Sequence, residues 1–278
     1  MFRGQKYNLT EESVEFNGHT LRRVEYTPEF KEYYKRTHRE SVDLNKGGFI
    51  EHPYNLRQDD DALILDNAKV FEESRVRDQA IVKDEAVIGG LAGVFGSAGV
   101  RGNSHIDGMA TISGHADISG TAQVTEKATV SDRGKVGDGC RVSGAVSVDD
   151  HASVKGNVSV GGLATITGDA KVIGDETGMT IDGMAYIGGS AKVKGGEGMH
   201  IGGDVRLYGC VRVEDISLVG KEEFCVGKIT TESLEKETEK NETVLKKADS
   251  FACKEAGTHH GHLNGLPERG PMSIGGRS

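Results

Sequence analysis

Valine or isoleucine occupies every sixth position of the chain from Ile64 to Val172. The position two residues before each of them holds a small residue, and thirteen of these nineteen positions are alanine. A spacing of two places both side chains on the same face of a short strand. A period of six therefore predicts a short strand and a corner, repeated along this part of the chain.

The position two residues after each valine or isoleucine holds glycine, aspartate or glutamate. Glycine adopts positive φ without steric cost, and aspartate tolerates it, so these positions indicate corners. No proline occurs between Pro53 and Pro267, as expected where every strand joins a continuous ladder. Three hexapeptides would close one turn, so we predict an all-β fold: a single-stranded parallel β-helix of about eight coils over residues 61–220.

The six-residue repeat slips twice after Val172. Ile181, Ile187 and Val193 resume it after three extra residues. A second slip of two residues precedes the last inward positions, which we expect to be Ile201, Leu207, Val213 and Val219. The extra residues, near Asp175–Thr180 and Gly195–His200, should form small loops at corners.

The two flanks differ in composition from the repeat. Residues 1–60 predict a β-rich cap, with a hairpin around Asn17-Gly18 and a short helix from Thr27 to Arg39. The cap should cover the outward apolar residues of the first coils, which are Leu63, Leu65, Ile81 and Val87. Residues 221–278 predict a charged helix from Thr231 to Ala256 and a glycine-rich tail.

The [Val/Ile]-x-x-x-[Ala/Ser]-x pattern resembles that of the hexapeptide-repeat superfamily. This resemblance implies a left-handed β-helix, and much of that superfamily consists of trimeric acyltransferases. The leading segment, with Gly47-Gly48-Phe49-Ile50-Glu51, Asn55-Leu56 and the unit from Asp66 to Val70, is similar to the YdcK-like proteins of enterobacteria and their phages. Those proteins are mostly described as transferases without an assigned reaction.

The composition of the chain excludes several classes of function. The 278 residues carry a net charge of -9, 40 glycines and no tryptophan, which suits a repetitive fold with small core residues. The four cysteines show no CxxC spacing, so we expect a reduced, cytoplasmic protein without a metal site. No apolar run is long enough for a membrane span, and no basic block indicates nucleic-acid binding.

Histidines are the candidates for catalysis. An acyltransferase would use His105, His115 or His151 as the general base toward an acyl-CoA, in a site between subunits. His115 and His151 should share a corner, two coils apart, with Arg133 between them, and this column could bind an anion. Solvated turn residues are the alternative interpretation, and no adjacent-coil cluster of histidine with a carboxylate stands out.

A second candidate is a corner of apolar residues. Leu91, Met109, Leu163 and Met184 should lie on one corner together with Ala145, interrupted by Lys127. A line of exposed apolar residues indicates an interface. Self-association, docking of the C-terminal helix or a protein partner would each cover it.

Two weaker patterns each have an ordinary alternative explanation. Thr111, Thr129, Ser147 and Thr165 should form a short hydroxyl ladder, which could order water, although threonine simply favours strands. His259-His260-Gly261-His262 could bind a metal but lacks cysteine or carboxylate partners.

The sequence thus favours a non-catalytic β-helical scaffold without a cofactor. It would act through protein partners and self-association, as a homo-oligomer that could be a trimer. The alternative is a hexapeptide-repeat acyltransferase that uses acyl-CoA. A third class, an acidic mimic of nucleic acid, fits less well because acidic and basic residues are interspersed along the rod.

Overall fold

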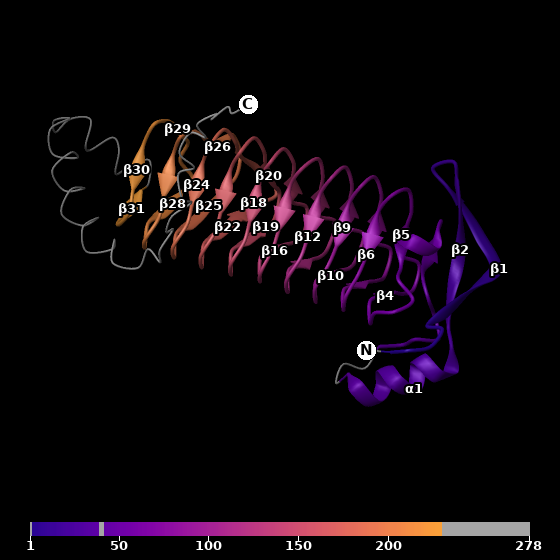
Figure 1. Cartoon of the computed structure of the whole chain (residues 1–278). Coiled ribbons are helices and arrows are strands. Elements are labelled where there is room, and N and C mark those ends of the chain that lie inside the picture. Colours follow the sequence, from indigo (N-terminus) through magenta and orange to yellow (C-terminus); the bar gives the residue numbers. More distant parts are fainter. Residues whose placement is uncertain (1, 39–41, 230–278) are drawn as a thin grey trace, which may run out of the picture.

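The computed structural model describes residues 2–38 and 42–229. This part of the chain is all-β with one α-helix, and its mostly parallel sheets form a β-solenoid of about ten turns. Figure 1 shows the strands stacked along a straight rod. The predicted β-helix is confirmed, whereas eight coils were too few because strands before Ile64 and after Val219 extend the stack. The left-handed winding stays a prediction.

Three sheets form the sides of the rod. The first contains β1 (Tyr7–Phe16), β2 (His19–Tyr26), β3 (Phe49–Ile50), β5 (Lys69–Val70), β8 (Val87–Ile88), β11 (His105–Ile106), β14 (Gln123–Val124), β17 (Arg141–Val142), β20 (Val158–Val160), β23 (Met179–Ile181), β26 (Met199–Gly203) and β29 (Leu218–Gly220). The second contains β4 (Leu63–Ile64), β7 (Ile81–Val82), β10 (Gly99–Val100), β13 (Asp117–Ile118), β16 (Lys135–Val136), β19 (Ser153–Lys155), β22 (Lys171–Gly174), β25 (Lys192–Gly195), β28 (Arg212–Glu214) and β31 (Lys228–Ile229). The third contains β6 (Arg75–Val76), β9 (Gly93–Val94), β12 (Thr111–Ile112), β15 (Thr129–Val130), β18 (Ser147–Val148), β21 (Thr165–Ile166), β24 (Tyr186–Ile187), β27 (Arg206–Leu207) and β30 (Glu223–Phe224).

The core is the interior of the solenoid. Every valine and isoleucine of the six-residue repeat from Ile64 to Val172 is buried, and so is the small residue two positions before each. In the third sheet, Ile112 pairs with Val130 and Val130 with Val148, so inward side chains stack from one turn to the next. The small residue fits beside a branched neighbour in the narrow interior, which is why the two positions alternate in size.

The predicted corner positions adopt positive φ, from Asp66 to Gly168. Several are glycine, and at Gly114 an added Cβ would lie 2.8 Å from backbone atoms of Asp132 in the next turn. Gly174 is the exception, because the residues inserted after it extend β22 through that position.

Acidic corner residues have a specific structural role. The Oδ2 atom of Asp78 accepts a hydrogen bond from the backbone N–H of Gly96, at 2.9 Å and 18 residues further on. Asp84 accepts in the same way from Gly102, also at 2.9 Å. A corner N–H would otherwise lack a partner in the strand ladder, so each carboxylate ties its turn to the next.

Both predicted register slips are confirmed, since Val160 pairs with Ile181 and Ile181 with Ile201. A third change of register, at Asp215, was not predicted. Val213 is followed by an inward position five residues later rather than six, so Leu218 pairs with Ile201 and is buried. Val219 was predicted to point inward, but it is 56% exposed. The shorter corner at Asp215 moves the alternation of the strand by one residue, which exchanges the two faces.

The N-terminal segment caps one end of the rod (Figure 1). The hairpin is confirmed: β1 and β2 pair antiparallel around Asn17 and Gly18, both at positive φ. The helix is confirmed as α1 (Pro28–Thr37), where Thr27 Oγ1 accepts from the N–H of Phe30. Strand β2 pairs with β3, which pairs in parallel with β5, so the hairpin continues the first sheet.

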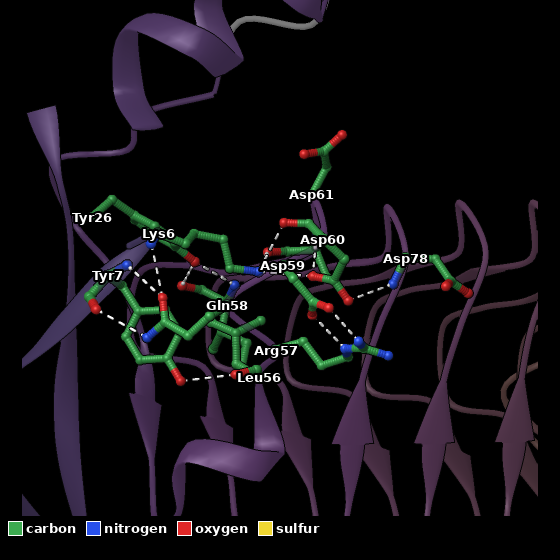
Figure 2. Close-up of polar contacts among 12 residues, drawn as sticks. Lys6, Tyr7, Tyr26, Leu56, Arg57, Gln58, Asp59, Asp60, Asp61 and Asp78 are labelled. Atoms are coloured by element: carbon green, nitrogen blue, oxygen red, sulfur yellow. Dashed lines mark hydrogen bonds and ion pairs between the residues drawn. The ribbon is translucent and has the colours of Figure 1, made fainter. Parts of the chain in front are cut away.

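Side chains of the cap satisfy backbone groups at the open end. The Tyr26 hydroxyl donates to the carbonyl of Ile64 and accepts from its N–H. Asn55, in the 3-10 helix η1 (Pro53–Asn55), donates to the carbonyls of Glu72 and Ser74. The amine of Lys6 donates to the carbonyls of Asp60 and Ala62 and to the Asp60 carboxylate (Figure 2). The cap therefore supplies the hydrogen-bond partners that a further turn of the solenoid would have supplied.

Apolar contacts complete this junction. Leu63 and Leu65 are buried, and Ile81 and Val87 are half-buried against the core clusters, as predicted for cap docking. The predicted helix from Thr231 to Ala256, the glycine-rich tail and the histidines at 259, 260 and 262 lie outside the described residues. Among the described residues, no helix has both the length and the apolar character that crossing a membrane requires.

Candidate functional site

One corner of the solenoid, between the first and third sheets, carries a line of exposed apolar side chains. Leu91, Met109, Leu163 and Met184 expose 61%, 48%, 59% and 57% of their surface. We call these four residues the apolar corner. Exposed apolar residues scattered singly are ordinary, but several of them gathered along one corner are typical of an interaction surface.

Backbone hydrogen bonds hold the apolar corner in a straight column. The N–H of Leu91 donates to Gly108, next to Met109 in the following turn. The N–H of Leu163 donates to Gly183 in the same way, next to Met184. Lys127 and Ala145 fill the two intervening turns of the corner, so the predicted interruption is present. Successive side chains are therefore spaced by about 4.8 Å, the distance between hydrogen-bonded strands.

The corner between the third and second sheets carries the predicted basic column. The side chains of His115, Arg133 and His151 line a groove of about 560 Å³, together with Lys135, Ser153, Lys155, Lys171 and Ile173. Arg133 Nη1 lies 3.2 Å from His151 Nε2, so these two side chains meet across adjacent turns. His151 Nδ1 lies 3.9 Å from Asp169 Oδ1, at the outer limit of an ion pair.

His105 lies apart from this groove. It belongs to β11 in the first sheet, where its register partners are Val87 and Gln123. Its Nε2 atom lies 3.6 Å from Asp107 Oδ2. The structure thus brings His115 and His151 together with Arg133, and it places His105 on another side of the rod.

A histidine–carboxylate pair on adjacent turns was missed in the sequence. His200 Nε2 lies 2.8 Å from Asp182 Oδ1, and both side chains are partly exposed. The insertion at Gly195–His200 makes this turn longer than 18 residues. His200 and Asp182 therefore become neighbours only when the insertion is included in the alignment of turns. This contact links two adjacent turns near the end of the first sheet.

The hydroxyl ladder is present over four turns of the third sheet. Thr111, Thr129, Ser147 and Thr165 are successive register partners, and the next partner is Tyr186. The Ser147 hydroxyl donates to Asp149 Oδ2 at 2.9 Å, so a carboxylate lies beside the ladder. The ladder spans four turns, ends at Tyr186 and lies beside Asp149. It therefore does not form the extended flat hydroxyl surface that would order water.

Within residues 2–38 and 42–229, no group of three or more histidine, cysteine, aspartate or glutamate side chains is arranged to hold a metal ion. Cys140 is buried in the column of small inward residues, and burial raises the pKa of its thiol to about 11. That thiol is therefore protonated at neutral pH and is a poor nucleophile.

A comparison with protein-family models found no match, and a comparison with curated proteins found none either. What the structure establishes is the architecture, a capped parallel β-solenoid, whose outer surfaces carry an apolar corner and a basic groove.

Proposed function

We propose that this chain is a non-catalytic β-solenoid scaffold that associates with further copies of itself through the apolar corner. The observation that carries the proposal is the column of four large apolar side chains, each about half exposed or more, held on one straight corner. A homo-oligomer with its corners facing one another would remove these side chains from water. Each side chain removed would contribute about 1–2 kcal/mol to association.

The straightness of the column favours association between rods. A ridge on a rigid solenoid meets an identical ridge over several turns without rearrangement of either chain, so the ordering cost is small. Lys127 divides the ridge into Leu91 with Met109 and Leu163 with Met184, which sets the register between two copies. A dimer and a trimer in which the apolar corners meet are both compatible with this contact.

Sedimentation velocity tests the proposal with a triple variant, Leu91→Ser, Leu163→Ser and Met184→Ser. We expect the unmodified chain to form a discrete oligomer and the variant to be monomeric at the same concentration. Ile173→Ser is the matched control, because Ile173 is also exposed but lies in another column. A monomeric unmodified chain, or dissociation caused equally by the control, would refute the proposal.

The basic groove favours a second candidate, an acyltransferase that uses acyl-CoA. Its cationic lining suits the phosphates of such a carrier, and His115 or His151 would act as the general base between subunits. The resemblance to hexapeptide-repeat enzymes and to YdcK-like proteins supports this candidate. Thermal-shift measurements with acetyl-CoA, repeated with His115→Ala and His151→Ala, test it; an unchanged melting temperature of the unmodified chain argues against it.

A further inference from the structure

Cationic side chains form a line along the outer face of the second sheet. Register pairing places six residues in one outward column, which are Lys135, Ser153, Lys171, Lys192, Arg212 and Lys228. The lysines and the arginine of this column are all exposed. The last four members lie in consecutive turns, so their charges repeat about every 4.8 Å along the rod.

A second outward column runs beside the first, two residues further along each strand. It contains Lys155, Ile173, Lys194 and Glu214. We call the lysine and arginine residues of the two columns the basic face. Arg133 extends the positive charge onto the neighbouring corner, through the groove that it shares with Lys135 and Lys155.

Only part of this charge is neutralised within the described part of the chain. Lys228 Nζ lies 2.6 Å from Glu214 Oε2, and the Glu214 carboxylate also interacts with the charges of Lys194 and Arg212. The other nearby acids are Asp175, which interacts with Lys194, Asp169, which faces His151, and Asp117, whose Oδ2 accepts from Arg101 at 2.8 Å. Like charges on directly paired positions destabilise a sheet, so Lys171, Lys192 and Arg212 impose a cost on the fold that an anionic partner would relieve.

We propose that the basic face binds the phosphate backbone of double-stranded DNA, without sequence preference. A duplex carries one negative charge per about 1.7 Å of its axis and is stiff over this length, so it can lie along a straight row of cations. Lysine and arginine that contact phosphates give affinity and orientation rather than base recognition. The flat sheet offers no helix or ribbon that could enter the major groove.

The composition of the face distinguishes this partner from other polyanions. Single-strand binders stack bases on aromatic side chains, and neither column contains an aromatic residue. Membrane-surface segments combine lysine with several large apolar groups, whereas Ile173 is the one exposed apolar side chain of the two columns. The net charge of -9 for the whole chain makes so local a concentration of positive charge unusual.

The sequence alone conceals this face. The cationic members of the first column are separated by 16 to 36 residues along the chain, with acidic residues between them, so no run of basic residues is visible. The lack of such a run was the reason to expect no nucleic-acid partner. Only the pairing of strands one turn apart, including the two insertions, aligns these residues.

Fluorescence anisotropy with a labelled duplex of about 20 base pairs tests the proposal on the full chain across a salt series. We expect a Kd of about 10⁻⁵ M or tighter at low salt, rising steeply with salt. The triple variant Lys171→Gln, Lys192→Gln and Arg212→Gln should weaken binding at least tenfold. It should also reduce the slope of log K against log salt by about 3, one unit for each lost phosphate contact.

The matched control is Arg75→Gln, Arg141→Gln and Arg206→Gln, which removes the same charge from exposed positions outside the second sheet. It should keep at least half of the affinity and the full salt slope. Equal losses in both triple variants, or no duplex binding at low salt, would overturn the proposal. So would tenfold tighter binding of a single strand of the same length, or binding to phosphatidylserine vesicles without binding to the duplex.

Discussion

The amine nitrogen of Lys6 lies 2.8 Å from Oδ1 of Asp60, and both side chains are buried where the cap meets the solenoid. Burial lowers the pKa of Lys6, while the neighbouring Asp60 carboxylate opposes that shift. The other oxygen of Asp60 accepts from the N–H of Asp78 at 2.9 Å, as the acidic corners do one turn later (Figure 2). Asp60 thus connects the cap to the first complete turns.

Lys6→Met should destabilise the chain by about 3–5 kcal/mol, because it leaves the Asp60 carboxylate buried without its cation. Denaturant unfolding followed by circular dichroism measures the loss. The double variant Lys6→Met with Asp60→Asn should recover part of it, since the buried charge is then removed. Arg57→Met is the control: its ion pair with Asp59 is exposed, so the loss should stay below about 1 kcal/mol. Equal losses for Lys6→Met and Arg57→Met would contradict the role of the buried pair.

The register near the end of the rod gives a second prediction. Leu218→Asp should open the last turns, because it places a charge inside the solenoid, whereas Val219→Asp should change their stability by less than about 0.5 kcal/mol. Amide hydrogen exchange of residues 199–229 is the measurement, since each turn contacts only its neighbours and can open locally. A larger effect of Val219→Asp than of Leu218→Asp would mean that Val219 points inward at the six-residue spacing. That outcome would refute the pairing of Leu218 with Ile201.

A third prediction concerns pH. His19 Nδ1 lies 2.9 Å from Glu51 Oε1, and this hydrogen bond raises the pKa of His19 above its ordinary value of 6.5. Protonated His19 therefore stabilises the fold below pH 6.5, and that contribution is lost as the pH rises through the raised pKa. The melting temperature of the unmodified chain should fall relative to that of His19→Gln over this interval. A difference that is constant from pH 5 to pH 9 would exclude the linkage.

The cysteines provide a fourth prediction. Cys140 is buried and its thiol has a pKa of about 11, whereas Cys210 is exposed. In a chain carrying Cys225→Ser and Cys253→Ser, a thiol reagent at pH 8 should label Cys210 rapidly and Cys140 only on unfolding. Cys140→Ala, which restores the usual residue of the small inward column, should leave one rapidly labelled thiol and a stable fold. Rapid labelling of Cys140 in the folded chain would show that its position in the column is wrong.

The sequence predicted the solenoid well because its inward positions leave little choice of residue. A branched side chain and a small one must alternate in a narrow interior, so the period of six is visible wherever the turns are regular. The corners were predicted for the same reason, since positive φ restricts residue type. Val219 and Gly174 were misassigned because insertions and deletions at corners change the register without a marker in the inward pattern.

The outer surface was predicted less completely, because outward positions are not restricted by packing. The apolar corner was found since its residues keep a constant spacing from Leu91 to Leu163. The basic face and the pair of His200 with Asp182 were missed because they depend on the insertions after Gly174 and Gly195. The polar junction of the cap, with Lys6 more than fifty residues from Asp60, carries no periodic signal at all.

The acidic corner residues make the same contact from one turn to the next. Asp78 and Asp84 each accept from the corner N–H that lies 18 residues further on, so excision of 18 residues between equivalent corners leaves the carboxylate facing the next equivalent N–H. The ends created by such an excision would still match. The length of the rod is therefore adjustable in steps of about 4.8 Å, independently of the cap and of whatever the remaining turns display.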